Sequence, residues 1–168
     1  MIQRHGKAKA SPRSASKKTS LGGVRVLVVE ARYYDDIANE LLAGAKAALE
    51  KAGALFDIVT VPGALEIPGA IVIALDAAKQ RRRPYEAAVA LGCVIRGDTS
   101  HYDIVAGESA RGMMDLAVQR GALIGNGILT TDDGRQAHVR ADPDGKDKGG
   151  AAARAALALL QIKRCFGR

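Results

Sequence analysis

The stretch Ala87-Ala88-Val89-Ala90-Leu91-Gly92-Cys93-Val94-Ile95 is almost wholly apolar and leads directly into Arg96-Gly97-Asp98-Thr99-Ser100-His101. Its apolar run predicts a strand at residues 87–91 that continues towards Ile95. An uninterrupted apolar strand is buried on both faces, which is typical of a parallel sheet covered by helices on each side. The stretch therefore predicts an α/β fold, with a polar segment at the carboxyl end of one central strand.

Outward from this strand, short β-branched runs alternate with longer amphipathic stretches, the pattern of repeated βαβ units. Apolar positions that recur every four residues predict a first helix, which ends at Gly53. Asp35 or Asp36 can cap the start of this helix. The other predicted strands are 24–30, 56–61 and 123–129, and the other predicted helices are about 66–78, 101–120, 133–140 and 148–164. Together these elements predict a three-layer α/β/α sandwich around a four-stranded parallel sheet.

The length of 168 residues, of which 48% are hydrophobic, suits one globular domain, which we expect at residues 21–168. The longest apolar stretch, residues 67–75, is about half of the roughly 20 residues that a membrane span requires. No apolar segment of a secretory signal follows the basic start of the chain. We therefore expect a cytoplasmic protein.

Residues 1–20 contain six basic and no acidic side chains, so they carry +6 of the net charge of +7 and leave +1 (7 − 6) for the rest. This segment has few large apolar residues, and we expect it to be a disordered arm. A basic arm can bind RNA or an acidic partner. The favoured interpretation is a solvated extension, because no aromatic residue lies among the charges to stack on bases. A nucleic-acid partner is therefore not expected.

The two cysteines, Cys93 and Cys165, form no CxxC motif and no Cys/His cluster with metal-ligand spacing. We therefore predict neither a disulfide nor a metal site. Cys93 is interpreted as a small buried side chain of the predicted strand.

Ligands of parallel α/β sheets bind beyond the carboxyl ends of the strands, so a site is expected just after Glu30, Val61, Ile95 and Leu129. After the first of these, Tyr33 and Tyr34 are adjacent, and at least one ring can lie against a planar heterocycle. Packing of both rings into the core is an equally open alternative.

The segment Val61-Pro62-Gly63-Ala64-Leu65-Glu66-Ile67-Pro68 places small residues and a carboxylate at the start of a predicted helix. A carboxylate there is stabilised by the helix dipole. Glu66 is therefore either a simple helix cap or an acceptor of hydrogen bonds from hydroxyl or amine groups of a ligand.

The segment 96–101 combines a glycine, a Thr/Ser pair and consecutive backbone amides at a helix start, which suits a phosphate group. His101 follows directly and is placed to move protons beside a bound phosphate. A lone histidine is more often a surface residue, but four converging loops favour the functional interpretation. Farther along, Arg140 and Lys148 are either solvated charges or the source of a cation for a phosphate ester.

Three stretches at consistent spacing resemble the lumazine synthase family over residues 24–166. They are residues 61–68, residues 91–103 (Leu91-Gly92-Cys93-Val94-Ile95-Arg96-Gly97-Asp98-Thr99-Ser100-His101-Tyr102-Asp103), and Gly127-Ile128-Leu129-Thr130-Thr131. The resemblance implies a flavodoxin-like fold and a transferase of riboflavin biosynthesis. It implies condensation of 5-amino-6-(D-ribitylamino)uracil with 3,4-dihydroxy-2-butanone 4-phosphate to 6,7-dimethyl-8-ribityllumazine, with release of phosphate and water and without a cofactor or metal.

Carried over by position, the resemblance makes His101 the catalytic proton donor. It implies that the pyrimidine substrate meets a stacking ring, a loop for the ribityl chain and backbone groups at its edge, namely Tyr33, Ala64, Leu65, Glu66, Cys93, Val94, Ile95 and Asn126. The butanone phosphate would meet the backbone of Asp98 and Thr99 and the guanidinium of Arg140.

Some positions depart from the family's pattern. Tyr33 stands where many members carry Phe or Trp, Asn126 stands where Phe is common, and Asp98 adds a carboxylate beside the expected phosphate. Residues 132–137 also differ from the usual pattern and leave the local helix start open. The changes at Asp98 and Asn126 motivate an alternative, a flavin- or lumazine-binding paralogue with weak activity.

The resemblance also implies a homopentamer in which a neighbouring subunit completes each site near Asn126 and Arg140. Some members of the family assemble twelve pentamers into a shell. The spacing between the last two helices permits such a shell, whereas the basic arm could hinder or decorate one.

Overall fold

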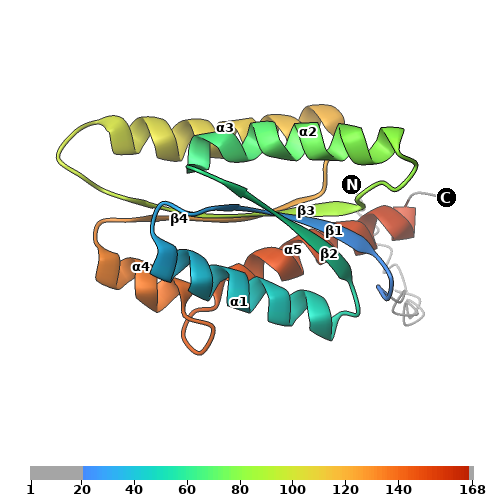
Figure 1. The fold of residues 1–168 in the computed structure, drawn as a ribbon, viewed down its shortest axis with the longest axis horizontal. Helices are drawn as coiled ribbons and strands as arrows, with labels where there is room; N and C mark the ends of the chain where they lie inside the picture. The colour runs from blue at the N-terminus through green and yellow to red at the C-terminus, as the bar shows by residue number, and fades with distance from the viewer. Residues whose placement is uncertain (1–20, 167–168) are drawn as a thin grey trace, which may run out of the picture.

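The computed structural model describes residues 21–166, which form a parallel sheet between two layers of helices (Figure 1). The strands lie in the order β2-β1-β3-β4. Their bounds are β1 Arg25–Ala31, β2 Leu55–Val61, β3 Ala87–Ile95 and β4 Ile124–Thr131. The helices are α1 Asp35–Lys51, the 3₁₀ turn η1 Ala64–Glu66, α2 Ile67–Gln80, α3 His101–Arg120, α4 Gly134–Ala141 and α5 Lys148–Phe166.

Helices α2 and α3 cover one face of the sheet, and α1, α4 and α5 cover the other (Figure 1). The predicted three-layer α/β/α fold with four parallel strands is therefore confirmed. The arm expected at residues 1–20 lies outside the described residues, as do the last two residues of the expected domain.

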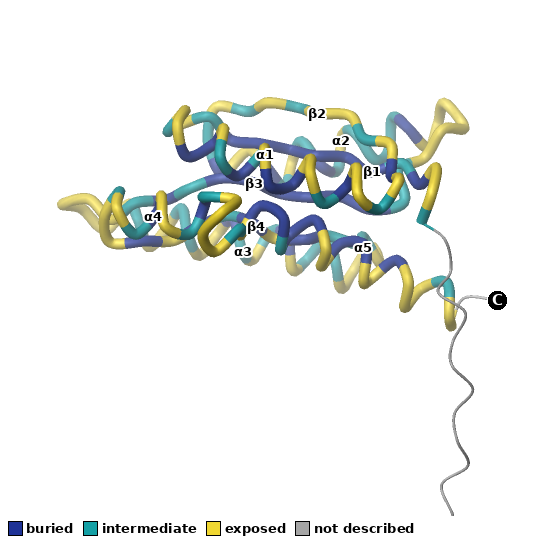
Figure 2. The backbone as a smooth tube through the Cα atoms, turned by 90° about the horizontal axis from the view of Figure 1, so that it is seen from below, coloured by how far each residue is buried: buried dark blue, intermediate teal, exposed yellow. Residues whose placement is uncertain are grey.

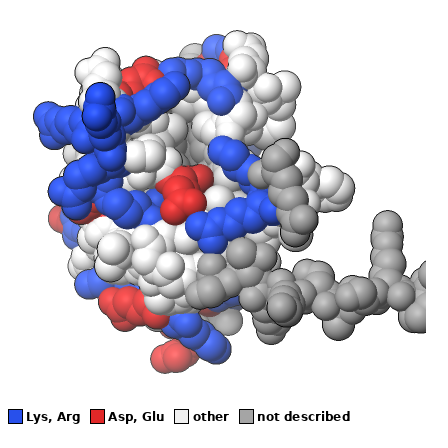
Figure 3. Space-filling view, turned by 90° about the vertical axis from the view of Figure 1, so that its right-hand side faces the viewer, with Lys and Arg blue, Asp and Glu red and all other residues white. Residues whose placement is uncertain are grey.

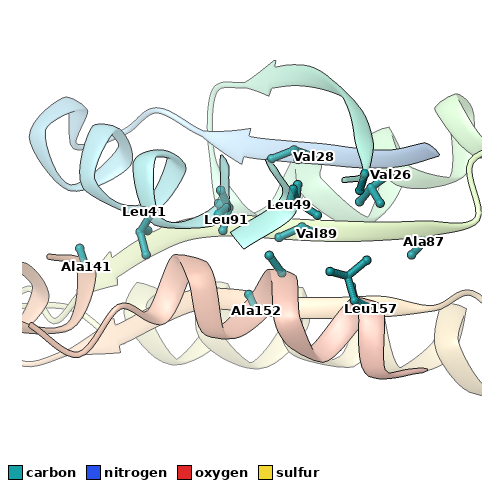
Figure 4. Close-up of a cluster of buried hydrophobic side chains, with 14 of the residues drawn as sticks. Val26, Val28, Leu41, Leu49, Ala87, Val89, Leu91, Ala141, Ala152 and Leu157 are labelled. Atoms are coloured by element: carbon teal, nitrogen blue, oxygen red, sulfur yellow. The ribbon is translucent and has the colours of Figure 1, made fainter. Parts of the chain in front are cut away.

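The two central strands, β1 and β3, supply the core on both faces of the sheet. Val28 and Val89 pack with α1 and α5 on one face (Figure 4), whereas Val29 and Ala90 pack with α2 on the other. Burial on both faces follows from the uninterrupted apolar sequence of these strands. The edge strand β2 differs, because Leu55 is 60% exposed and helices leave much of this strand open (Figure 2).

The first helix begins without the side-chain cap that the sequence suggested. Tyr34 occupies the N-cap position and forms no side-chain cap hydrogen bond, so the prediction of Asp35 or Asp36 as the cap is wrong. Both carboxylates instead lie in the first turn of α1, where the helix dipole stabilises negative charge. Gly53 follows the helix with a φ of +71°, which glycine adopts without steric cost.

Gly125 lies in β4 at a point where another part of the chain comes very close to the strand. A Cβ atom at Gly125 would overlap the carbonyl oxygen of Ala152 in α5. The close neighbour is therefore the backbone of α5, and the absence of a side chain lets this helix lie directly on the strand.

The helix start at residues 132–137 is well defined despite its unusual sequence. The Asp133 carboxylate accepts a 2.7 Å hydrogen bond from the backbone amide of Gln136, and the Gln136 side chain accepts one of 3.3 Å from the amide of Asp132. This reciprocal arrangement is close to a capping box, and it begins α4 at Gly134.

Candidate functional site

A hollow of about 540 Å³ lies at the carboxyl end of the sheet, on the left in Figure 1, where a site was expected. Segments after β1, β2 and β3 and the first turns of α3 form its walls. Its lining residues are Tyr33, Tyr34, Pro62, Gly63, Ala64, Leu65, Glu66, Cys93, Val94, Ile95, Gly97, Thr99, His101, Tyr102 and Val105. This volume is within the usual range for pockets that hold small molecules.

The sequence left open whether the two tyrosines after β1 pack into the core or face a ligand, and in the structure they differ in this respect. Tyr34 is half-buried against the core, and this burial raises the pKa of its hydroxyl, with smaller contributions from Tyr33 and Cys93. Tyr33 is 73% exposed, and its ring meets that of Tyr34 edge to face with 4.9 Å between centroids. Tyr34 thus serves as the support, and the free face of Tyr33 can stack on a planar ligand.

A polar network beneath these tyrosines fixes the turn that carries them. Glu30 is buried at the end of β1 and accepts hydrogen bonds from Thr60 at 3.0 Å and from Arg32 at 3.2 Å. Arg32 also donates to Asn39 at 2.6 Å and to Asp35 at 3.0 Å. Because a buried carboxylate must be paired, this network ties the turn to both β2 and α1.

The wall after β2 presents an unused carboxylate. Glu66 occupies the N-cap position of α2, but its side chain forms no cap hydrogen bond, which speaks against the interpretation as a simple cap. The side chain is exposed at the hollow and lies beside Gly63, where a Cβ atom would come within 3.0 Å of Oε2. Glu66 is therefore available to accept hydrogen bonds from a polyhydroxylated ligand.

The floor of the hollow is formed by the last residues of β3. Burial raises the pKa of the Cys93 thiol to about 11, although a hydrogen bond with Thr131 opposes the shift. The thiol is therefore neutral at physiological pH and is not a nucleophile. Neighbouring Val94 is buried, so side chains here contribute apolar surface to the hollow.

The third wall is the loop between β3 and α3, and Arg96 holds its base. The Arg96 guanidinium lies 4.0 Å from the ring centroid of Tyr102 and 3.5 Å from carboxylate oxygens of both Asp103 and Asp132. Its backbone amide donates to Thr131 on the neighbouring strand at 2.9 Å. These contacts join the loop to the first turn of α3 and to the end of β4.

His101 is the first residue of α3 and reaches the hollow from there. Its backbone amide donates to the Thr99 hydroxyl at 3.4 Å. The first backbone amides of a helix lack partners within the helix and carry a partial positive charge, which suits an anion. The loop thus offers an anion site with an imidazole beside it.

The structure brings most of the predicted site residues to one hollow, namely Tyr33, Ala64, Leu65, Glu66, Cys93, Val94, Ile95, Thr99 and His101. Asp98 is exposed in the loop but does not line the hollow. Asn126 lies within β4, opposite Ala90, where its side chain accepts a 2.9 Å hydrogen bond from the amide of Ile128. Arg140 donates to the Gln136 carbonyl at 2.9 Å and is also absent from the lining.

Sequence reasoning missed Tyr102 and Val105 as lining residues of the hollow. Both lie in the first two turns of α3, one and four positions after His101. The helical repeat would have indicated Val105, because positions i and i+4 share a helix face, whereas Tyr102 at i+1 does not follow from it.

Residues 21–166 contain no group of three or more His, Cys, Asp or Glu side chains arranged to hold a metal. Over the same residues, no helix has both the length and the apolar character to span a membrane.

Comparison with known proteins identifies the family of this chain. The family model of 6,7-dimethyl-8-ribityllumazine synthase matches residues 23–164. A protein of that name from Afipia carboxidovorans is 60% identical over 157 residues, covering 92% of this chain and 96% of the relative. A second, from Methylorubrum populi, is 65% identical over 145 residues, which cover 86% of each chain. A third, from Nitrobacter winogradskyi, is 60% identical over 147 residues, covering 88% of this chain and 90% of the relative.

The match covers all described strands and helices except the end of α5, and it includes every residue that lines the hollow. The chain therefore belongs to the 6,7-dimethyl-8-ribityllumazine synthase family.

Proposed function

We propose that this chain condenses 5-amino-6-(D-ribitylamino)uracil with 3,4-dihydroxy-2-butanone 4-phosphate in the hollow at the carboxyl end of the sheet. The observation that carries this proposal is the combination of an exposed aromatic face, a free carboxylate and a helix N-terminus with an adjacent imidazole around one cavity. These groups match the heterocycle, the polyhydroxyl chain and the phosphate of the two substrates. Membership of the family supports the same reaction.

In this proposal the pyrimidine ring stacks on Tyr33, and backbone groups of residues 93–95 meet its edge. The ribityl hydroxyls donate to Glu66, which lies in the adjacent wall. The butanone phosphate binds to the amides around Asp98 and Thr99 at the start of α3. The two substrates then lie side by side, and the reaction becomes effectively unimolecular, which supplies most of the rate acceleration.

His101 moves protons while the 5-amino and ribitylamino nitrogens of the pyrimidine form C–N bonds to the butanone carbons, the C–O bond to phosphate breaks, and the displaced oxygens leave as water. The condensation releases inorganic phosphate and water, and each departure requires a proton at the leaving oxygen. An imidazole beside the phosphate is placed to deliver it. The residues need to supply only position, electrostatic stabilisation and proton transfer, and we propose no cofactor for this reaction.

We further propose that the active form is a homopentamer in which a neighbouring subunit completes each hollow. Asn126 and Arg140 do not line the hollow of their own chain, so a neighbouring copy can present them. Large apolar side chains are exposed on α2 and α3, with Ile73 at 72%, Ile104 at 54%, Met114 at 60% and Val118 at 76%. Exposed apolar surface of this kind favours contact with another protein surface. A larger assembly of pentamers and a cytoplasmic location remain part of the proposal.

Substitution of His101 tests the assignment of chemistry to the hollow. We expect His101→Ala to lower kcat by about 10²-fold, the lower end for general acid–base catalysis, because positioning supplies most of the rate. The matched control is His138→Ala on α4, whose imidazole pairs with Glu40 outside the hollow. Steady-state assays of both variants, after their oligomeric mass has been verified, make the comparison. Equal kcat for the two variants would contradict the role of His101.

Substitution of Tyr33 separates the two subsites. Tyr33→Ala should raise KM for the pyrimidine substrate about tenfold, since base–aromatic stacking contributes about 1–3 kcal/mol. KM for the butanone phosphate should change little, because the phosphate binds at the opposite wall. A rise in the second KM alone would place the pyrimidine elsewhere.

A further inference from the structure

Tyr33, the residue proposed to stack on the pyrimidine, lies on a short turn and has few contacts of its own. It is the middle residue of the segment 32–34, which connects β1 to α1. Within residues 21–166, Tyr33 forms no hydrogen bond, and its ring contact is with Tyr34. Because the side chain is 73% exposed, packing does not fix the ring either. Its orientation therefore depends on the residue at each side of it, Arg32 and Tyr34.

The Arg32 guanidinium holds this turn from both sides. On the β1 side, Nη1 donates to the Glu30 carboxylate at 3.2 Å. On the α1 side, Nε donates to Asp35 at 3.0 Å and Nη2 donates to Asn39 at 2.6 Å, both in the first two turns of the helix. The Arg32 backbone amide also donates to the Val61 carbonyl at 3.2 Å. One side chain thus joins the element before the turn to the element after it.

The carboxylate at the centre of this network is buried. Glu30 is 4% exposed, and the Thr60 hydroxyl on β2 donates to it at 3.0 Å. Among residues 21–166, Arg32 is the only cation that pairs with it. A buried carboxylate without its cation is strongly unfavourable, so loss of the guanidinium would open the end of β1 towards water. Such a change would displace the backbone directly before Tyr33.

Arg32 acts on the catalytic hollow without lining it. None of the residues in its network, namely Glu30, Arg32, Asp35 and Asn39, belongs to the lining. Each of the three guanidinium nitrogens already donates within the network, so none is directed to a ligand. Arg32 is therefore placed to orient a residue that binds the substrate, and is not placed to bind the substrate itself.

The same network reaches the second wall proposed for the pyrimidine substrate. Glu30 and Thr60 are partners in the register of β1 and β2, and Thr60 lies two residues before Pro62, where the wall that presents Glu66 begins. No hydrogen bond within residues 21–166 joins the network to residues 97–101, where the butanone phosphate is proposed to bind. The network is thus connected to the pyrimidine side of the hollow.

We infer that Arg32 is a positioning residue for the pyrimidine substrate, because its guanidinium sets the orientation of the Tyr33 ring relative to the wall that carries Glu66. The inference rests on the proposed function, which places the pyrimidine against Tyr33. Residues that contact a ligand must be held to within about 0.5 Å by side chains that do not touch it. Arg32 meets this description, and the butanone phosphate should not depend on it.

Steady-state kinetics of Arg32→Ala test the inference. KM for the pyrimidine should rise about fivefold, less than the about tenfold expected for Tyr33→Ala, because the ring is tilted rather than removed. Both kcat and KM for the butanone phosphate should stay within about twofold of the wild type.

A second variant, Arg32→Lys, keeps a cation for Glu30 and so avoids an unpaired buried carboxylate. Its single ammonium cannot reproduce the planar fork that donates to β1 and α1 together. It should raise KM for the pyrimidine by about threefold, with the other parameters unchanged.

A double-mutant cycle separates positioning of the ring from a general structural effect. If Arg32 acts through the Tyr33 ring, Arg32→Ala should change KM for the pyrimidine by less than about twofold once Tyr33 is alanine. Independent effects would multiply to about fiftyfold (5 × 10) in the variant R32A/Y33A. The cycle therefore distinguishes a rise of about tenfold to twentyfold from one of about fiftyfold.

The matched control is Arg25→Ala, at the other end of the same strand. The Arg25 side chain is 23% exposed, against 28% for Arg32, and it pairs with Asp57 at 2.7 Å. Arg25 begins β1 at the end of the molecule that faces the viewer in Figure 3, where many Lys and Arg side chains gather. This variant loses the same charge and a comparable ion pair, but both KM values should stay within about twofold of the wild type.

Calorimetric titration with the pyrimidine substrate alone makes the result independent of turnover. Arg32→Ala should raise the dissociation constant by the same factor as KM, and Arg25→Ala should leave it unchanged. Absence of pyrimidine binding by the wild-type chain would contradict the proposed function together with the inference. The inference alone would be overturned if the wild type binds and both Arg32 variants match Arg25→Ala, if both KM values rise equally, or if R32A/Y33A reaches the fiftyfold product.

Discussion

The two thiols of the chain differ in burial, and this difference predicts their reactivity. Cys93 is partly buried with a pKa of about 11, whereas Cys165 is exposed near the end of α5. A raised thiol pKa means that the reactive thiolate forms only as the pH approaches 11. At pH 8, iodoacetamide should therefore alkylate Cys165 and leave Cys93 unmodified, and Cys93 should react faster as the pH rises.

Peptide mass spectrometry after timed alkylation checks this prediction, with Cys165→Ser as the control that leaves Cys93 as the sole target. Equal alkylation rates of the two cysteines at pH 8 would show that the floor of the hollow is more open than its burial indicates.

Residues at strand ends were the most predictable part of the site. Cys93 lies near the end of one apolar run and Thr99 follows it, and the topology of a parallel sheet fixes the edge at which that run ends. The sequence could not place Asn126, because its position within β4 depends on register, or Arg140, whose guanidinium donates to its own helix. The sequence also could not predict where Asp98 lies relative to the expected phosphate, which its carboxylate would repel. In the structure this residue does not line the hollow.

At the scale of elements, the contact between β4 and α5 depends on glycine. A Cβ at Gly125 would overlap the Ala152 carbonyl, and neither backbone can move without disturbing its hydrogen bonds. We expect Gly125→Ala to lower the free energy of unfolding by about 1–3 kcal/mol, the usual effect of overpacking a core.

Urea denaturation of the variant measures this change, and Gly134→Ala is the control because no atom lies within 4 Å of a Cβ at that position. Gly134→Ala should be neutral or slightly stabilising, since alanine favours a helix. A Gly125→Ala protein as stable as the wild type would show that α5 can shift away from the strand.

Element positions were predictable where periodicity was strong. The helix at residues 101–120 matches α3, because a strand end precedes it and Gly121, with a φ of +64°, ends it. Local hydrogen bonding was harder to anticipate, as the uncapped start of α1 shows. The sequence does not predict the short 3₁₀ turn at Ala64–Glu66. The predicted helix begins at about residue 66, one residue before α2, and the turn directly precedes it.

At the scale of the whole molecule, the proposed oligomer predicts a definite mass. A chain of 17.6 kDa should behave as a pentamer of about 88 kDa (5 × 17.6), or as a multiple of that mass if pentamers associate. Sedimentation velocity at micromolar concentration gives this mass directly. A stable, fully active monomer would contradict the proposal that a neighbouring subunit completes the hollow.

Assembly was the least predictable property, because the pattern of one chain does not distinguish an exposed apolar side chain from an interface residue. Val118 is 76% exposed and Phe166 is 86% exposed, yet they lie on different helices. The fold follows from apolar periodicity, whereas assembly depends on surfaces that several elements form together.

Turnover of the two substrates by the folded wild-type chain is the most direct test of the catalytic hollow. Product absorbance and inorganic phosphate are followed together in the presence of both substrates. We expect one phosphate released for each 6,7-dimethyl-8-ribityllumazine formed, and neither product when one substrate is omitted. Stoichiometric flavin binding by a correctly assembled protein that forms no lumazine would contradict the proposed reaction and favour a binding paralogue.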